Sequence, residues 1–180
     1  MAETKYGKHL IHGPFTTIAH YTGTSMLAHD GEYDADVCIG LHCLADTRYS
    51  AAMPHTHDFH ELLCFIGGNP KDITDFGAEI EITLGEEREV HLINSTTVVS
   101  IPPGLLHCPL VVKKCDPNRP VSFLEISLTR KWPPMSDSIN KMTPKQLAFI
   151  TADMLEKMPA DMAKNISPER LNIIRANKKK

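Results

Sequence analysis

Residues 53–67 constrain the fold more than any other stretch of this sequence. Within Met-Pro-His-Thr-His-Asp-Phe-His-Glu-Leu-Leu-Cys-Phe-Ile-Gly, the polar donors His55, His57 and Glu61 occupy alternating positions. Successive side chains of a β-strand point to opposite faces, so a strand from about 55 to 66 places these donors on one face. The remaining positions of that face are Phe59, Leu63 and Phe65, and the opposite face holds Leu62, Cys64 and Ile66. A strand that is apolar on both faces favours a closed barrel or a sandwich.

A second stretch supplies a fourth metal donor. Ile101-Pro102-Pro103-Gly104 precedes Leu105-Leu106-His107. Proline fixes φ and glycine permits backbone angles that other residues resist, so this stretch predicts a tight turn that aims His107 inward.

Short apolar and alternating segments separated by Gly, Pro and Asn occupy much of the chain. The strands that they predict cover residues 36–44, 78–84, 88–93, 98–101, 109–113 and 121–128, with short strands or an arm before residue 33. This spacing indicates an all-β sandwich or barrel. Both faces of 36–44 are largely apolar, so we expect that strand to be buried.

The character of the sequence changes after Trp132-Pro133-Pro134. Thr143 is a good N-cap, with Pro144 at the first helical position and Gln146 completing a capping box. An apolar stripe at helical spacing follows at Leu147, Ile150, Met154, Leu155 and Met158, and Ser167-Pro168 starts another short helix. The stripe either packs onto the barrel or forms an oligomer contact.

Both donor segments together resemble the two motifs of the cupin superfamily. The first motif is matched by His55-Thr56-His57, Glu61 and Gly68, and the second by Pro102-Pro103-Gly104-Leu105-Leu106-His107. The resemblance covers about residues 35–130. Tyr49, Thr96 and Val111 depart from the family pattern at outer turn and edge positions rather than at the ligands.

The resemblance implies a single-domain, RmlC-like jelly-roll barrel with a short α-helical C-terminal tail. The expected division is an N-terminal arm at 1–45, a cupin core at 46–133 and a helical extension at 134–180. It also implies that His55, His57, Glu61 and His107 bind one divalent metal inside the barrel. Three imidazoles and a carboxylate suit iron, manganese, nickel, cobalt or zinc, and they leave one or two coordination positions open for a substrate.

Other residues are candidates for the surroundings of the metal. Glu125 is an acid among apolar residues of a predicted strand, and it either orients a ligand histidine, serves as a general base, or faces solvent from an edge strand. Tyr49 and Arg48 are candidates for the barrel mouth, Tyr49 as a catalytic residue and Arg48 as a substrate contact. Phe59, Leu63 and Phe65 are expected to shape the wall that a substrate meets.

Composition excludes several classes of protein. The net charge of −3 gives no field that would attract nucleic acid or an anionic membrane. The chain shows no signal-peptide pattern and no apolar run near the ~20 residues of a spanning helix, which predicts a cytoplasmic protein. Five cysteines without a CxxC pair argue against a disulfide framework and a zinc ribbon, so Cys64 and Cys108 are interpreted as small buried hydrophobes.

Three functions remain open from the sequence. The first is a metal-dependent enzyme acting on a small oxygen-containing molecule by dioxygenase, isomerase or lyase chemistry. The second is a non-catalytic module that binds or senses a metal or a small ligand, and the third is a jelly roll without metal. The apolar outer face formed by Leu62, Cys64 and Ile66, together with the methionine-rich stripe, also predicts a homodimer.

Overall fold

The computed structural model describes residues 5–6, 9–11, 13, 15–17, 24–51, 53–158 and 160–177. The strands among them are β1 (Phe15–Thr17), β2 (Thr24–Ala28), β3 (Cys38–Leu44), β4 (Ser50–Ala51), β5 (Glu61–Gly67), β6 (Ala78–Leu84), β7 (Glu89–Ile93), β8 (Thr97–Ile101), β9 (His107–Cys115) and β10 (Val121–Ser127). The helices are α1 (Met135–Lys141), α2 (Pro144–Leu147), α3 (Ala152–Glu156), α4 (Ala160–Ala163) and α5 (Pro168–Ala176). The closing lysines lie outside the described residues.

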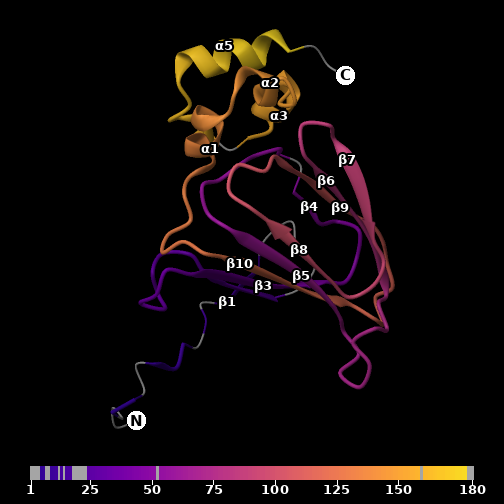
Figure 1. Cartoon of the computed structure of the whole chain (residues 1–180). Helices are drawn as coiled ribbons and strands as arrows, with labels where there is room; N and C mark the ends of the chain where they lie inside the picture. Colours follow the sequence, from indigo (N-terminus) through magenta and orange to yellow (C-terminus); the bar gives the residue numbers. More distant parts are fainter. Residues whose placement is uncertain are drawn as a thin grey trace.

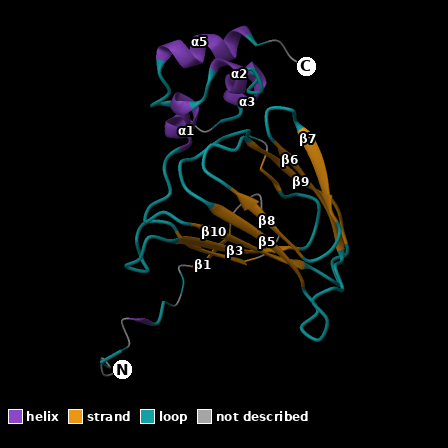
Figure 2. Cartoon of the chain, viewed as in Figure 1, coloured by secondary structure: helices purple, strands orange, loops and turns teal. Residues whose placement is uncertain are grey.

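The strands form two antiparallel sheets, in the orders β1-β2-β3-β10-β5-β8 and β4-β9-β6-β7. The pairs β3 with β10, β4 with β9, β5 with β8 and β6 with β7 are nested one inside the next along the chain. Between β3 and β10, the connections carry the chain repeatedly from one sheet to the other (Figures 1 and 2). Nested antiparallel pairs rolled up in this way make a jelly roll, so the predicted fold class is confirmed.

The main core lies between the two sheets. Phe65 of β5 and Phe123 of β10 stack at its centre, with ring centroids 4.8 Å apart and an interplanar angle of 5°. Ile80 and Ile82 of β6 face them as fully buried side chains. A core built from one face of each sheet explains why the predicted strands alternate in burial.

The structure corrects the start of the first motif strand. β5 begins at Glu61, whereas His55 forms an isolated bridge with His107, and residues 56–60 are irregular with a bend at 58–59. From Glu61 onward the predicted alternation is confirmed, because Glu61, Leu63 and Phe65 are buried and the residues between them are half-buried. The predicted strand is therefore confirmed from Glu61 onward and is wrong for His55 and His57.

Two further expectations about strands are wrong. The outward side of β3 is not fully buried, since Leu41 is 44% exposed. Glu125 does not lie on an edge, because β10 pairs with β3 on one side and with β5 on the other. Its side chain lines the same cavity as Phe123, two residues earlier on the strand, and is only 16% exposed.

The helices gather over one end of the barrel and have a small core of their own (Figure 1). Leu106, from the turn before β9, is buried among Ile139, Leu147, Ile150 and Ile174 of the helical segment. Thr143 makes the predicted capping box with Gln146. The apolar stripe is not one continuous helix, however, because α2 ends at Leu147 and α3 starts from a new N-cap at Thr151.

Met154, Leu155 and Met158 are half-buried and pack against this helical core. The stripe thus packs mainly within the helical core, to which Leu106 and Met53 contribute from outside the helices, and the oligomer contact stays a prediction. The helix α1 was not predicted by the periodicity, and the division of the chain into arm, core and extension stays a prediction.

Candidate metal centre

The four predicted ligands come from two segments that are hydrogen-bonded to each other. His55 and His57 precede β5, Glu61 is its first residue, and His107 is the first residue of β9. The backbone N–H of His55 donates to the carbonyl oxygen of His107 and the reverse bond is also made, both at 3.1 Å. Gly104, with φ of 81°, donates its N–H to the carbonyl oxygen of His57 at 2.8 Å. The turn after β8 is thereby fixed to the histidine segment.

Backbone carbonyl groups orient all three imidazoles in the same way. The Nδ1 atoms of His55, His57 and His107 lie 2.9, 2.8 and 2.9 Å from the carbonyl oxygens of Met53, Phe59 and Leu105. A carbonyl oxygen only accepts, so each Nδ1 carries the proton and donates it. Each Nε2 atom is then left with a lone pair, which is the state in which histidine binds a metal.

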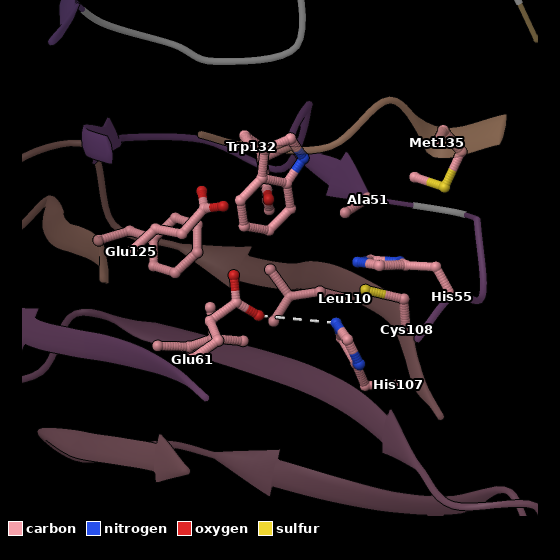
Figure 3. Close-up of a pocket in the computed structure, with 12 residues that line it drawn as sticks. Ala51, His55, Glu61, His107, Cys108, Leu110, Glu125, Trp132 and Met135 are labelled. Atoms are coloured by element: carbon pink, nitrogen blue, oxygen red, sulfur yellow. Dashed lines mark ion pairs between the residues drawn. The ribbon is translucent and has the colours of Figure 1, made fainter. Parts of the chain in front are cut away.

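The Glu61 carboxylate faces these lone pairs. Its Oε2 atom lies 3.3 Å from Nε2 of His57 and 3.6 Å from Nε2 of His107, the contact marked in Figure 3. Its Oε1 atom accepts a hydrogen bond from the Ser127 hydroxyl at 3.2 Å. The Nε2 atom of His107 is buried and has no hydrogen-bond partner in the described part of the chain.

Burial controls the protonation of this cluster. It raises the pKa of the Glu61 carboxyl and lowers the pKa of the His55 imidazole. Burial, with the neighbouring His55, holds the pKa of His107 well below its ordinary value. His55 and His107 therefore favour the neutral form, and a cation among these donors would offset the cost of ionising the buried Glu61 carboxyl.

The ligand atoms fall into two overlapping groups. Those of His57, Glu61 and His107 lie within 4.8 Å of one another, and so do those of His55, His107 and Cys108. The structure thus brings three of the predicted ligands into one group and joins His55 to them through the shared His107. Imidazole and carboxylate donors fit a divalent transition metal, and a cysteine sulfur beside them is an additional donor that the motif does not contain.

A cavity of about 190 Å³ opens beside the cluster (Figure 3). Its lining residues are Tyr49, Ala51, His55, Glu61, Leu63, His107, Cys108, Leu110, Phe123, Glu125, Trp132 and Met135. Tyr49, Leu63 and Glu125 therefore lie where a substrate would meet them. Phe65 does not line the cavity, because it is buried in the core against Phe123.

Arg48 and Phe59 also lie outside the cavity lining. The Arg48 side chain is 67% exposed and pairs with Asp46, with 2.7 Å between Nε and the carboxylate. Phe59 stacks flat on the ring of His57, with centroids 4.1 Å apart and an interplanar angle of 4°. Phe59 thus packs against the predicted ligand His57. The structure gives no support for the expected substrate contacts of Arg48 and Phe59.

The sequence analysis missed residues that hold the site from later parts of the chain. Trp132 lines the cavity and packs edge-on against Phe59 at 5.4 Å between centroids. The Ser138 hydroxyl of α1 donates to the carbonyl oxygen of Thr56 and accepts from the Thr56 N–H, the latter at 3.0 Å. The sequence offered one weak signal: Trp132 is the single tryptophan and lies shortly after the last predicted strand.

Glu125 has neighbours on the inner face of the sheet. Its Oε2 atom lies 3.7 Å from Nε2 of His42, and Nδ1 of His42 is 2.8 Å from the Ser25 hydroxyl. A Cβ atom at Gly40 would come within 2.7 Å of the His42 ring and 3.3 Å of the carboxylate. Glycine at this position therefore leaves the room that the two side chains occupy.

Comparisons with known proteins bear on the fold. No family model matches the chain, and no curated protein matches it. An RmlC-like cupin from Shewanella frigidimarina is 10% identical, with a TM-score of 0.41 over 66% of this chain and 86% of its own. The polyketide cyclase RemF from Streptomyces resistomycificus is 14% identical, with a TM-score of 0.46 over 92% and 98% of the two chains.

An oxalate decarboxylase from Lactobacillus farciminis is also 14% identical, with a TM-score of 0.46 over 86% of this chain and 42% of its own. At these identities and TM-scores the likeness does not select a reaction. Among the described residues, none of the helices is long and apolar enough to cross a membrane. The nested strand pairs show a jelly-roll fold, and the two donor segments of the chain resemble the cupin motifs.

Proposed function

We propose that this protein is a metal-dependent enzyme that binds one divalent transition metal and transforms a small oxygen-containing molecule. His57, Glu61 and His107 would hold the metal, with His55 as the fourth protein ligand. One observation carries the proposal: buried Nε2 lone pairs converge on a buried carboxylate at the wall of a cavity. Side chains of this kind are costly to bury together without a cation between them.

The cavity suits a small ligand. Sites for drug-sized molecules usually measure about 300–1,000 Å³. The present cavity is about 190 Å³, and its wall is largely apolar. A bound metal would supply a Lewis acid with an open position for a substrate oxygen. Apolar side chains such as Leu63, Leu110 and Phe123 would exclude water around it.

Glu125 is the residue that we propose for proton transfer. Its carboxylate faces the cavity from β10 and is not one of the ligand groups. A carboxylate near a bound substrate can take a proton from it or return one. His42, whose ring also contacts the Ser25 hydroxyl, lies 3.7 Å from the Glu125 carboxylate and would fix its orientation. Tyr49 lines the same cavity and is a second candidate for a polar contact.

The alternative is a non-catalytic module that binds the metal or a small ligand. The placement of Glu125 in the cavity favours the enzyme, because binding a metal does not require a second carboxylate in the wall. Proteins with this fold catalyse many different reactions. The reaction class that we propose is therefore metal-assisted chemistry on an oxygen-bearing substrate.

Elemental analysis of the purified protein tests the metal. We expect about one equivalent of a transition metal, lost in His57→Ala and in His107→Ala. His91→Ala is the matched control, because His91 lies on β7 with a side chain that is 49% exposed. Metal retained in both ligand variants, or no metal even after reloading, would contradict the proposal.

Glu125→Gln separates the enzyme from the binding module. We expect this variant to keep the metal and to lose turnover when small hydroxy acids, keto acids and phenols are screened as substrates. Binding of such compounds without turnover by the unmodified protein would favour the binding module instead.

A further inference from the structure

Two consecutive residues of β9, His107 and Cys108, line the same cavity (Figure 3). Successive side chains of a regular strand point to opposite faces. Both of these side chains are buried, and their exposed fractions are 1% and 4%. The backbone at the start of β9 therefore departs from the regular alternation of inward and outward side chains.

A β-bulge provides the break. Along β6 the residues Ile82 and Leu84 are two positions apart, but their partners Leu110 and His107 on β9 are three apart. The extra residue lies in the segment that contains Cys108, whose φ is +74°. Non-glycine residues rarely adopt this left-handed conformation, which occurs in bulges and is concentrated at functional sites.

Arg88 holds the backbone of the bulge in place. Its Nη1 atom donates to the carbonyl oxygen of Cys108 at 3.1 Å. The sulfur atom of Cys108 lies within 4.8 Å of ligand nitrogens of His55 and of His107. Cys108 forms no disulfide, so a disulfide bond does not occupy its sulfur atom.

We propose that Cys108 is a sulfur ligand of the metal, which it shares with His107 and His55. This inference rests on the proposed metal site and defines the class of metal that it takes. On binding, the thiol S–H bond breaks, a sulfur–metal bond forms, and the proton leaves to solvent. Thiolate donors favour zinc and other soft or borderline ions, whereas carboxylate and carbonyl sites suit manganese and magnesium.

The competing interpretation is the one from the sequence, in which Cys108 is a small buried hydrophobe. Simple packing explains its burial. It does not explain why a bulge with an unfavourable backbone angle brings this sulfur, at the border of the main core, within 4.8 Å of ligand nitrogens of two histidines.

Cobalt(II) substitution tests the proposal. Cobalt bound through nitrogen and oxygen shows weak visible bands, and a thiolate ligand adds an intense charge-transfer band in the near ultraviolet. We expect that band in the unmodified protein, and we expect Cys108→Ser and Cys108→Ala to lose it while they keep the visible bands. Cys64→Ser is the matched control, because Cys64 is half-buried on the outward face of β5.

The affinity for two metals gives a second readout. Cys108→Ser should weaken zinc binding by at least about tenfold, and manganese binding should change much less. Equal losses for both metals would contradict a sulfur ligand and indicate general damage to the site.

X-ray absorption of the zinc-loaded, unmodified protein needs no variant. A sulfur neighbour at about 2.3 Å, beside nitrogen and oxygen neighbours at about 2.0–2.1 Å, is the expected result. Visible cobalt bands without the charge-transfer band, or no sulfur at the zinc, would overturn the role of Cys108 and leave the proposed function standing. No binding of cobalt or zinc would overturn both.

Discussion

The backbone N–H of Gly104 donates to the carbonyl oxygen of His57 at 2.8 Å and so connects the two motif segments. Gly104 has a φ of 81°, and a Cβ atom placed on it would meet nothing within 4 Å. Any effect of a larger residue at position 104 would therefore come from backbone strain rather than from a steric clash.

Gly104→Val should weaken metal binding although position 104 supplies no ligand. The strained backbone should cost roughly 1–3 kcal/mol of stability and shift the segment that holds His57. Gly31→Val is a matched control, since Gly31 has a φ of 89° and a Cβ there meets nothing closer than 3.8 Å. Calorimetric titration with zinc should show lost affinity only for the Gly104 variant, and equal losses in both would contradict this prediction.

Ser127→Ala should lower metal affinity about 10–100-fold. The Ser127 hydroxyl donates to Oε1 of Glu61 and leaves Oε2 directed at the histidines. Without that bond the carboxylate can rotate away from its ligand position. Ser122→Ala serves as the control, because Ser122 is exposed on the same strand. Competition with a chromogenic chelator measures the affinities, and an unchanged value for Ser127→Ala would show that Glu61 needs no support.

Removal of the metal should lower the melting temperature. A ligand present at a hundredfold excess over its Kd stabilises the native state by about 2.7 kcal/mol. For a domain of this size that corresponds to roughly 5–10 °C. Calorimetry with and without a chelator should show the shift in the metal-loaded protein and none in His57→Ala. An unchanged melting temperature after addition of the chelator would mean that no metal stabilises this fold.

The predicted homodimer has a specific candidate surface. On the outward face of the larger sheet, Leu41, Leu124, Cys64 and Val98 form a cross-strand row without a charged residue. Leu41 is 44% exposed and Val98 is 59% exposed. Two copies of such a row could pack face to face and remove apolar surface from water.

Leu124→Lys should therefore convert a dimer into a monomer of 20.1 kDa, as measured by light scattering. Val90→Lys is the control on the smaller sheet, since Val90 is 61% exposed on β7. A monomeric unmodified protein would contradict the predicted homodimer. Dissociation caused by Val90→Lys but not by Leu124→Lys would show that the interface lies on the smaller sheet.

Local sequence signals determined the strands, the caps and the identity of the predicted ligands. The alternation in β5 and β6 follows from burying one face of each strand, and the Thr143 capping box follows from bonds within four residues. These features depend on neighbours in the chain, which is why a single sequence predicts them. The identities of His55, His57, Glu61 and His107 came from motif spacing of the same local kind.

The positions of those ligands depended on tertiary structure. His55 and His57 do not lie on a regular strand, and their segment is held by hydrogen bonds from His107 and Gly104, both distant in the chain. Glu125 shares the cavity-facing side of β10 with Phe123, and the central position of β10 between β3 and β5 keeps it away from a sheet edge. The local sequence around Glu125 does not show that β10 is a central strand. Cys108 turns inward through a bulge set by its pairing with β6. Burial and strand pairing between remote segments decide which side chains meet, so only the folded chain brings the cysteine and the second carboxylate to the site.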